Sequence, residues 1–120
     1  MLNPKTDLRV RSYSFSLMIL EFVNYLPNKR SAWIIADQLL RSGTSIGANI
    51  AEARGSSSRL EFKKFYQIAL KSANESKYWL DLIKDSKLSQ GENVSKIILE
   101  LDEISKMLGS SIITLKNSKF

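Results

Sequence analysis

This chain of 120 residues contains no histidine and no cysteine, which excludes the usual zinc sites, histidine-containing di-iron motifs and Ser-His or Cys-His nucleophiles. Its apolar content of 43% is that of a folded protein, whereas its longest apolar runs, such as Leu17–Leu20, are too short to span a membrane. A net charge of +6 favours polyanionic partners such as RNA or DNA.

The first predicted helix covers residues 8–26, and Pro27 ends it because proline cannot continue a helix. The row that faces the core consists of Leu8, Phe15, Ile19, Phe22 and Leu26. At about 100° per residue a second apolar row lies largely opposite the first. This outer row consists of Val10, Tyr13, Leu17 and Leu20. In a monomer it would meet water.

The second predicted helix covers residues 32–53, and Gly55 supplies its C-terminal cap. Its core row consists of Ala32, Ala36, Leu39, Gly43, Ile46, Ile50 and Ala53. Gly43 and Gly47 each cost ~1 kcal/mol of helix propensity relative to alanine, which indicates that another part of the chain approaches closely. We expect a bulky side chain to fill the space, and the candidates are Phe62, Phe65 and Trp79.

Two further helices follow short breaks that contain serine or glycine. The core row of the third consists of Phe62, Tyr66, Ala69, Ala73, Ser76, Leu80 and Ile83. The core row of the fourth consists of Val94, Ile97, Leu101, Ile104, Leu108 and Leu115. Both starts fit a capping box, in which two side chains satisfy each other's free backbone donors, and the pairs are Ser58 with Glu61 and Ser89 with Glu92.

These segments predict an all-α protein, an antiparallel up-down-up-down four-helix bundle that forms a single domain over residues 1–120. No segment shows the period-two alternation of a strand. The breaks near residues 27–30, 55–57 and 87–90 are too short to cross a bundle, so consecutive helices should be antiparallel neighbours. Residues 1–12 lack the apolar stretch of a signal peptide. We therefore expect a cytoplasmic protein without metal site, cofactor or catalytic residues.

Exposed apolar residues indicate self-association. Helix three widens its apolar arc with Ile68, Trp79 and Leu82, and helix one carries the outer row of Val10, Tyr13, Leu17 and Leu20. Exposed together, such side chains would form a patch that soluble monomers rarely tolerate. One interpretation is that they only broaden contacts inside the bundle. We favour a homo-oligomer in which helix one lies at the subunit contact.

Polar residues follow one flank of the second helix. Helical spacing places Arg41, Ser45 and Glu52 on one side, with Asn49 between that side and the core row. Together with an acidic residue of helix three, Glu75, they are expected to form a structural network. The alternatives are a solvated face or a site where Arg41 binds a phosphate.

Positive charge follows the exposed sides of helix three and clusters near the starts of helices one and two. The candidate nucleic-acid contacts are Arg59, Lys63, Lys64, Lys71, Lys77, Lys84, Arg9, Arg11, Lys29 and Arg30. Acidic residues are interspersed, so an ordinary solvated surface is the alternative. Nothing in the sequence supplies base-specific readout, so binding should depend on backbone charge and shape.

Most of the chain, and most specifically residues 38–73, resembles a bacterial family that was first noticed as reading frames inside the intervening sequences of 23S ribosomal RNA genes. The core signature of this family has the form R-S-x-x-S-I-x-x-N-I-A-E, followed by a Gly-rich turn, E-F and an Ala-Ser-rich helix with an acidic residue. It is matched by Arg41, Ser42, Ser45, Ile46, Asn49, Ile50, Ala51, Glu52, Glu61, Phe62, Ala69, Ser72 and Glu75. Ala53 stands where a glycine is common in relatives. The family also includes the accessory proteins of diversity-generating retroelements.

This resemblance implies a four-helix bundle without enzymatic activity that assembles into ring-like homo-oligomers. In the retroelement accessory proteins these are pentamers, which bind a reverse transcriptase and nucleic acid. Our hypothesis is a non-catalytic nucleic-acid-binding scaffold, an accessory to a reverse transcriptase or to ribosomal RNA processing. The alternative is a structural homo-oligomer that acts through a protein partner. A carboxylate-and-metal enzyme is disfavoured, because the acidic residues of the four helices do not converge on the core row; these are Glu21, Glu52, Glu75 and Glu100.

Overall fold

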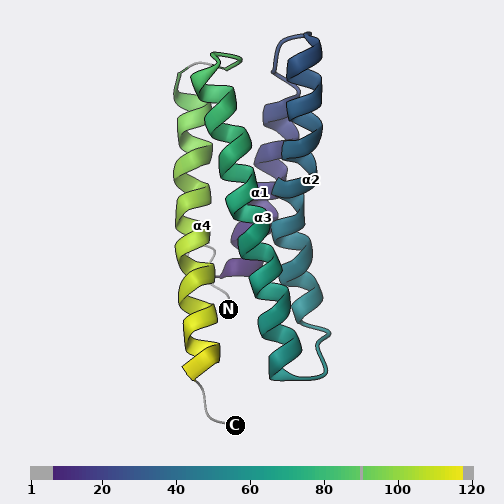
Figure 1. The fold of residues 1–120 in the computed structure, drawn as a ribbon, viewed down its shortest axis with the longest axis vertical. Coiled ribbons are helices and arrows are strands. Elements are labelled where there is room, and N and C mark those ends of the chain that lie inside the picture. The colour runs from purple at the N-terminus through teal and green to yellow at the C-terminus, as the bar shows by residue number, and fades with distance from the viewer. Residues whose placement is uncertain (1–6, 90, 118–120) are drawn as a thin grey trace.

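Four α-helices make up the part of the chain that the computed structural model describes, residues 7–89 and 91–117 (Figure 1). Their bounds are α1 Leu8–Val23, α2 Arg30–Ala53, α3 Arg59–Asp85 and α4 Glu92–Asn117. Consecutive helices run antiparallel and the described residues include no strand, which confirms the predicted four-helix bundle. The first helix ends at Val23, three residues earlier than predicted, because the amides of Asn24 and Tyr25 bond three residues back and tighten the chain into a turn.

Each helix contacts its two neighbours around the bundle. α1 packs against α2 and α4, and α3 packs against the same two helices, whereas the backbones of the diagonal pairs α1–α3 and α2–α4 lie further apart among the described residues. The connections α1–α2 and α3–α4 lie at one end of the bundle, at the top of Figure 1. The α2–α3 connection lies at the other end, with the C-terminal turns of α4. The outward faces of α1 and α3 therefore point to opposite sides of the molecule.

The core consists of the predicted rows with small changes. Phe15, Ile19, Leu39 and Leu101 are inaccessible to solvent, and most other members of the four rows are buried. The members that are only partly buried are Leu26, Ala36, Phe62 and Leu115. Ile112 is buried although the predicted row of the fourth helix skipped it. It lies four residues after Leu108, one turn further along the same face.

One of the two predicted capping boxes is present in part: Ser58 caps α3 as predicted, but the Glu61 carboxylate accepts from the residue before the cap. The Ser58 hydroxyl accepts from the amide of Glu61 at 3.1 Å, and the Glu61 carboxylate accepts from the amide of Ser57 at 3.3 Å. The second box is wrong: α4 begins only at Glu92, and Gly91 has a φ of 91° that no helical residue adopts. Ser89 therefore lies before the helix and does not cap it.

The two glycines of α2 allow α1, not an aromatic side chain of α3, to approach closely. A Cβ atom at Gly43 would lie 3.2 Å from Cγ1 of Ile19, and one at Gly47 would lie 3.3 Å from the backbone oxygen of Ser12. The expectation that Phe62, Phe65 or Trp79 fills this space is wrong. The neighbour is instead the Ile19 side chain at Gly43 and the backbone of Ser12 at Gly47, both on α1.

Candidate nucleic-acid interface

The hairpin formed by α3 and α4 is charged unevenly along its length. The half made of residues 59–74 and 104–117 carries six basic residues and one acidic residue. The other half, residues 75–89 and 91–103, lies next to the α3–α4 connection and carries four basic and seven acidic residues. The positive charge of this hairpin is therefore concentrated in the half nearer the α2–α3 connection.

An open groove of about 570 Å³ lies along the basic half of the hairpin. It is lined by Lys64, Gln67, Ile68, Leu70, Lys71 and Asn74 of α3 and by Ile112 and Lys116 of α4. Three ammonium groups and two amides thus surround an apolar floor, and no carboxylate belongs to the lining. Such a groove attracts anions through charge and offers hydrogen-bond donors to them.

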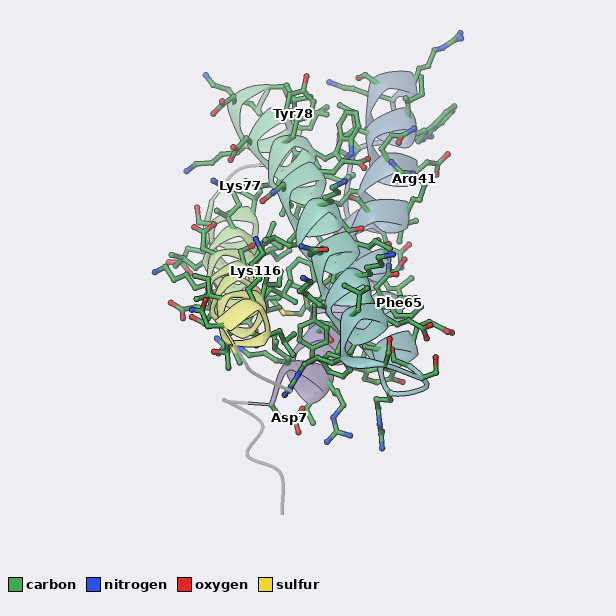
Figure 2. All side chains as sticks on the ribbon, turned by 60° about the horizontal axis from the view of Figure 1, so that its bottom comes forward. Asp7, Arg41, Phe65, Lys77, Tyr78 and Lys116 are labelled. Carbon is green, nitrogen blue, oxygen red and sulfur yellow. The ribbon has the colours of Figure 1, made fainter. Side chains whose placement is uncertain are left out.

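Helix geometry places the three lysines of this lysine groove. Lys64 and Lys71 are two turns apart on α3, about 10.5 Å along the helix axis. Lys116 comes from the last turn of α4, which runs antiparallel beside α3 (Figure 2). Lys64 and Lys71 are among the predicted nucleic-acid contacts, whereas Lys116 is not. Its position four residues after the apolar Ile112, on the same side of the helix, is the signal in the sequence that would have found it.

The structure pairs three of the other predicted basic contacts with carboxylates. Arg11 binds Glu100 of α4 through two nitrogens, at 2.8 and 2.9 Å, and these hydrogen bonds raise the pKa of the guanidinium. Arg9 lies 3.2 Å from the Asp7 carboxylate, and Lys77 lies 3.7 Å from that of Asp81. The remaining predicted positions are dispersed: Lys63 and Arg59 in the first turns of α3, Lys84 near its end, and Lys29 and Arg30 at the start of α2.

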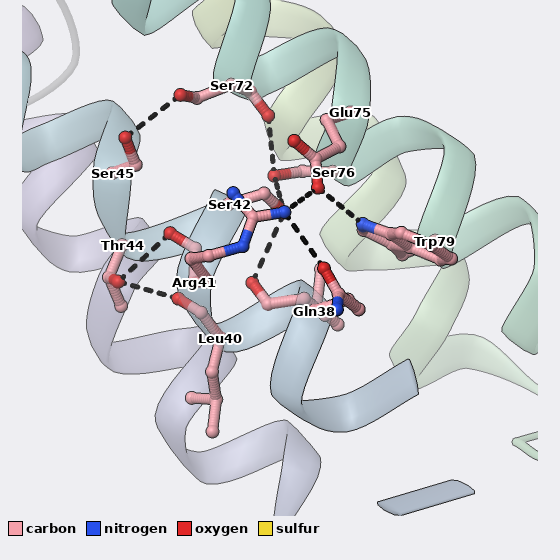
Figure 3. Close-up of polar contacts among 11 residues, drawn as sticks. Gln38, Leu40, Arg41, Ser42, Thr44, Ser45, Ser72, Glu75, Ser76 and Trp79 are labelled. Carbon is pink, nitrogen blue, oxygen red and sulfur yellow. Dashed lines mark hydrogen bonds and ion pairs between the residues drawn. The ribbon is translucent and has the colours of Figure 1, made fainter. Parts of the chain in front are cut away.

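A ladder of hydroxyl groups joins α2 to α3 (Figure 3). Ser76 donates to Ser42 at 2.9 Å and Ser72 donates to Ser45 at 2.9 Å. Ser42 and Ser76 are fully buried, so these bonds satisfy hydroxyls that would otherwise be costly inside the core. Asn49 donates to the backbone oxygen of Ser45 at 2.8 Å.

An ion pair between Arg41 and Glu75 continues this α2–α3 seam towards the solvent. The indole of Trp79 donates to the Glu75 carboxylate at 3.0 Å, and Arg41 also donates to the side-chain oxygen of Gln38 at 2.9 Å. The hydrogen bond from Trp79, together with Arg41, holds the pKa of Glu75 below its usual value. Four of the five predicted network residues thus lie along one seam, while Glu52 is exposed one turn beyond Asn49.

The predicted subunit contacts lie on opposite sides of the bundle. On α1, the exposed fractions of Tyr13, Leu17 and Leu20 are 68%, 52% and 48%, while Val10 is partly buried. On α3, Ile68 is exposed and also lines the lysine groove. The other two predicted contacts of α3, Trp79 and Leu82, are partly buried and lie in its opposite half.

The described part of the chain shows neither a membrane-spanning helix nor an acidic metal site. None of its helices combines the length and the apolar character needed to cross a bilayer. No group of three or more acidic side chains within residues 7–89 and 91–117 converges where a metal ion would bind.

Comparison with known proteins identifies a family and several similar solved structures. The model of the family described as 23S rRNA-intervening sequence protein matches residues 5–110. A crystal structure from Bacteroides thetaiotaomicron, of a protein with unknown function from the S23 ribosomal protein family, is 39% identical and superposes with a TM-score of 0.83. That match covers 88% of this chain and 98% of the other. No curated protein matches.

Proposed function

The chain belongs to the 23S rRNA-intervening sequence protein family, and on this premise we propose that it is a non-catalytic, oligomeric scaffold that binds nucleic acid. The observation that carries the proposal is the lysine groove, where Lys64, Lys71 and Lys116 meet without a lining carboxylate. In this proposal the protein acts in the cytoplasm as an accessory to ribosomal RNA processing or to a reverse transcriptase.

The composition of the groove favours binding to the nucleic-acid backbone. Lysine ammonium groups attract phosphates as point charges, and Gln67 and Asn74 add hydrogen-bond donors. The lining contains no aromatic ring on which a base would stack. Binding in this groove therefore depends on charge and salt, with weak preference for sequence.

Assembly into a ring multiplies this charge. Because α1 and α3 are diagonal, a contact between the outer row of α1 in one copy and the side of α3 near Trp79 and Leu82 in the next copy is heterologous. Heterologous contacts generate closed rings when the rotation between copies closes. Such a contact leaves the lysine groove, in the other half of α3, open to solvent. We extend the proposal to a pentamer because the chain resembles the pentameric retroelement accessory proteins.

Fluorescence anisotropy of labelled RNA and DNA, titrated with the protein at several salt concentrations, tests this function. For Z neutralised phosphates the logarithm of affinity falls against the logarithm of salt with a slope of about −0.9Z on duplex and −0.7Z on single strands. Absence of binding to both at low salt contradicts the proposal.

A protein partner is the second candidate function, and the surface beside Arg41 and Glu75 favours it. Tyr78 is 58% exposed and meets the Trp79 ring edge-on at 5.1 Å, while Ile34 on α2 is 55% exposed. Aromatic residues and arginine dominate the binding energy of protein interfaces. In this alternative the oligomer binds a reverse transcriptase or another protein, and purified material carries no nucleic acid, as its 260/280 nm absorbance ratio would show.

A further inference from the structure

The connection between α1 and α2 presents two exposed aromatic rings beside two cations. Tyr25 is 78% exposed and Trp33 57%, and neither ring takes part in an aromatic contact with another described residue. Lys29 and Arg30 lie between them in the chain and are both exposed. Residues 22–36 contain no acidic side chain. Proteins that bind single-stranded nucleic acid use this combination, in which bases stack on aromatic rings and cations attract the backbone.

The backbone holds this tip in a defined shape. The amide of Tyr25 bonds to the oxygen of Phe22 at 3.1 Å, and that of Lys29 to the oxygen of Pro27 at 2.9 Å. The amide of Trp33 bonds to the oxygen of Lys29 at 3.0 Å and begins α2. Both aromatic residues therefore stand on hydrogen-bonded backbone, which limits the conformational entropy lost when a ligand binds.

A hollow of about 240 Å³ opens beside Tyr25, between the last turns of α1 and the first turns of α4. Its apolar lining consists of Met18, Phe22 and Ile97, and its polar lining includes Ser89 and Asn93. The volume lies below the roughly 300–1,000 Å³ of sites for drug-sized ligands, so the hollow has room for one planar ring with hydrogen-bonding edges. Glu21 and Lys96 also line the hollow, so their opposite charges offset each other and a neutral base fits there.

We propose that the α1–α2 tip is a binding site for single-stranded RNA or DNA. Tyr25 and Trp33 stack bases, Lys29 and Arg30 hold the intervening phosphates, and one base enters the hollow beside Tyr25. The inference rests on the proposed nucleic-acid binding and adds a preference for single strands, because the bases of a duplex already stack on each other. The lysine groove, which lacks an aromatic ring, binds the phosphates of either form.

The experiment measures the affinity of the full chain for a labelled (dT)12, a labelled U12 and a labelled 12-base-pair duplex. Tyr25→Leu and Trp33→Leu are each expected to weaken single-strand binding by about 5- to 150-fold, the range found when one stacking ring is lost, and to change duplex binding less than about twofold. Tyr25→Phe and Trp33→Phe keep a ring and should keep the affinity. Circular dichroism checks that all four variants fold.

Two further measurements use the same site. In a Trp79→Phe background, (dT)12 should quench the fluorescence of Trp33, and the duplex should not. Lys29→Gln with Arg30→Gln should flatten the salt slope on single strands by about 1.4, since about 0.7 is lost for each phosphate contact.

The outcomes separate this inference from the proposed function. If the parent protein binds neither single strands nor duplex, the proposed function falls and takes this site with it. If the parent binds both, and the leucine variants bind single strands as well as the parent does, the stacking site alone is wrong. Equal losses on single strands and duplex also overturn it, because they would reflect a general effect on the protein.

Discussion

The guanidinium of Arg11 on α1 binds both carboxylate oxygens of Glu100 on α4, at 2.8 and 2.9 Å. Both side chains are about three-quarters buried, with exposed fractions of 22% and 24%. α1 has 16 residues, whereas each of the other helices has 24 or more, so its seam with α4 is short. This bidentate pair joins the two helices across that seam.

Arg11→Gln should therefore lower stability and leave nucleic-acid binding intact. A charged hydrogen-bonded pair of this burial contributes about 1–2 kcal/mol to the free energy of unfolding. Urea denaturation of Arg11→Gln, Glu100→Gln and the double variant measures the coupling. A salt slope of nucleic-acid binding that changes in Arg11→Gln would instead show that this arginine meets phosphate.

Arg11 was predicted to contact nucleic acid, and its pairing with Glu100 shows what can and cannot be predicted from the sequence. Apolar periodicity located all four helices, because burial of one face requires it whatever the neighbours are. Periodicity carries no information on which charged residue meets which across a seam. Arg11 and Lys64 therefore looked equivalent as basic residues, although one is paired across helices and the other lines an open groove.

The contact at the α2 glycines shows the same limit. Gly43 and Gly47 indicated a close approach, and that approach exists. We expected a bulky aromatic side chain to fill the space beside these glycines. The structure places Ile19 and the backbone of Ser12 there. The sequence gives the cost of a helical glycine, and only the packing of α1 against α2 shows what approaches it.

Gly47→Leu should destabilise the fold by roughly 1–3 kcal/mol, although leucine is the better helix former. The added Cβ would lie 3.3 Å from the Ser12 backbone oxygen, which moves only if α1 moves. Gly109→Ala is the matched control, because no atom lies within 4 Å of its added Cβ and α4 should gain up to about 1 kcal/mol. Thermal and urea unfolding measure both. A more stable Gly47→Leu variant would show that helix propensity outweighs the contact.

The α2–α3 seam should weaken in acid. The pKa of Glu75 is lowered in the folded state by the Trp79 hydrogen bond and by Arg41. The carboxylate therefore contributes stability above its unfolded pKa of about 4.5, and this contribution is lost as the pH falls through the lower folded value. Glu75→Gln should lose that part of the pH dependence. Unfolding midpoints between pH 7 and pH 2.5 for parent and variant test it, and identical profiles would contradict it.

Leu17→Lys should reduce the size of the assembly while leaving the helical circular dichroism unchanged. Leu17 is 52% exposed in the centre of the outer row of α1, so a charge there disturbs a subunit contact and not the core. Sedimentation equilibrium of the parent should give a mass several times 13.6 kDa. Thr114→Lys on α4 adds the same charge at an exposed site that belongs neither to the core row of α4 nor to the outer row of α1, and it should not change the mass. A monomeric parent at tens of micromolar rules out the oligomer.

The lysine groove gives the sharpest test of nucleic-acid binding, because the same hairpin supplies its control. Replacing Lys64, Lys71 and Lys116 together by glutamine should flatten the salt slope by about 2 on single strands and by almost 3 on duplex, if each lysine meets one phosphate. The bundle should stay folded, since Lys64, Lys71 and Lys116 are all exposed.

The control triple, Lys77, Lys84 and Lys87 to glutamine, removes the same charge from the half of the hairpin that has more acidic than basic residues. Lys77 there already lies 3.7 Å from the Asp81 carboxylate. We expect a smaller change of slope in the control, because neighbouring carboxylates keep phosphates away from this half. Equal slopes in the two triple variants would mean that binding follows net charge alone and that the groove has no special part in it.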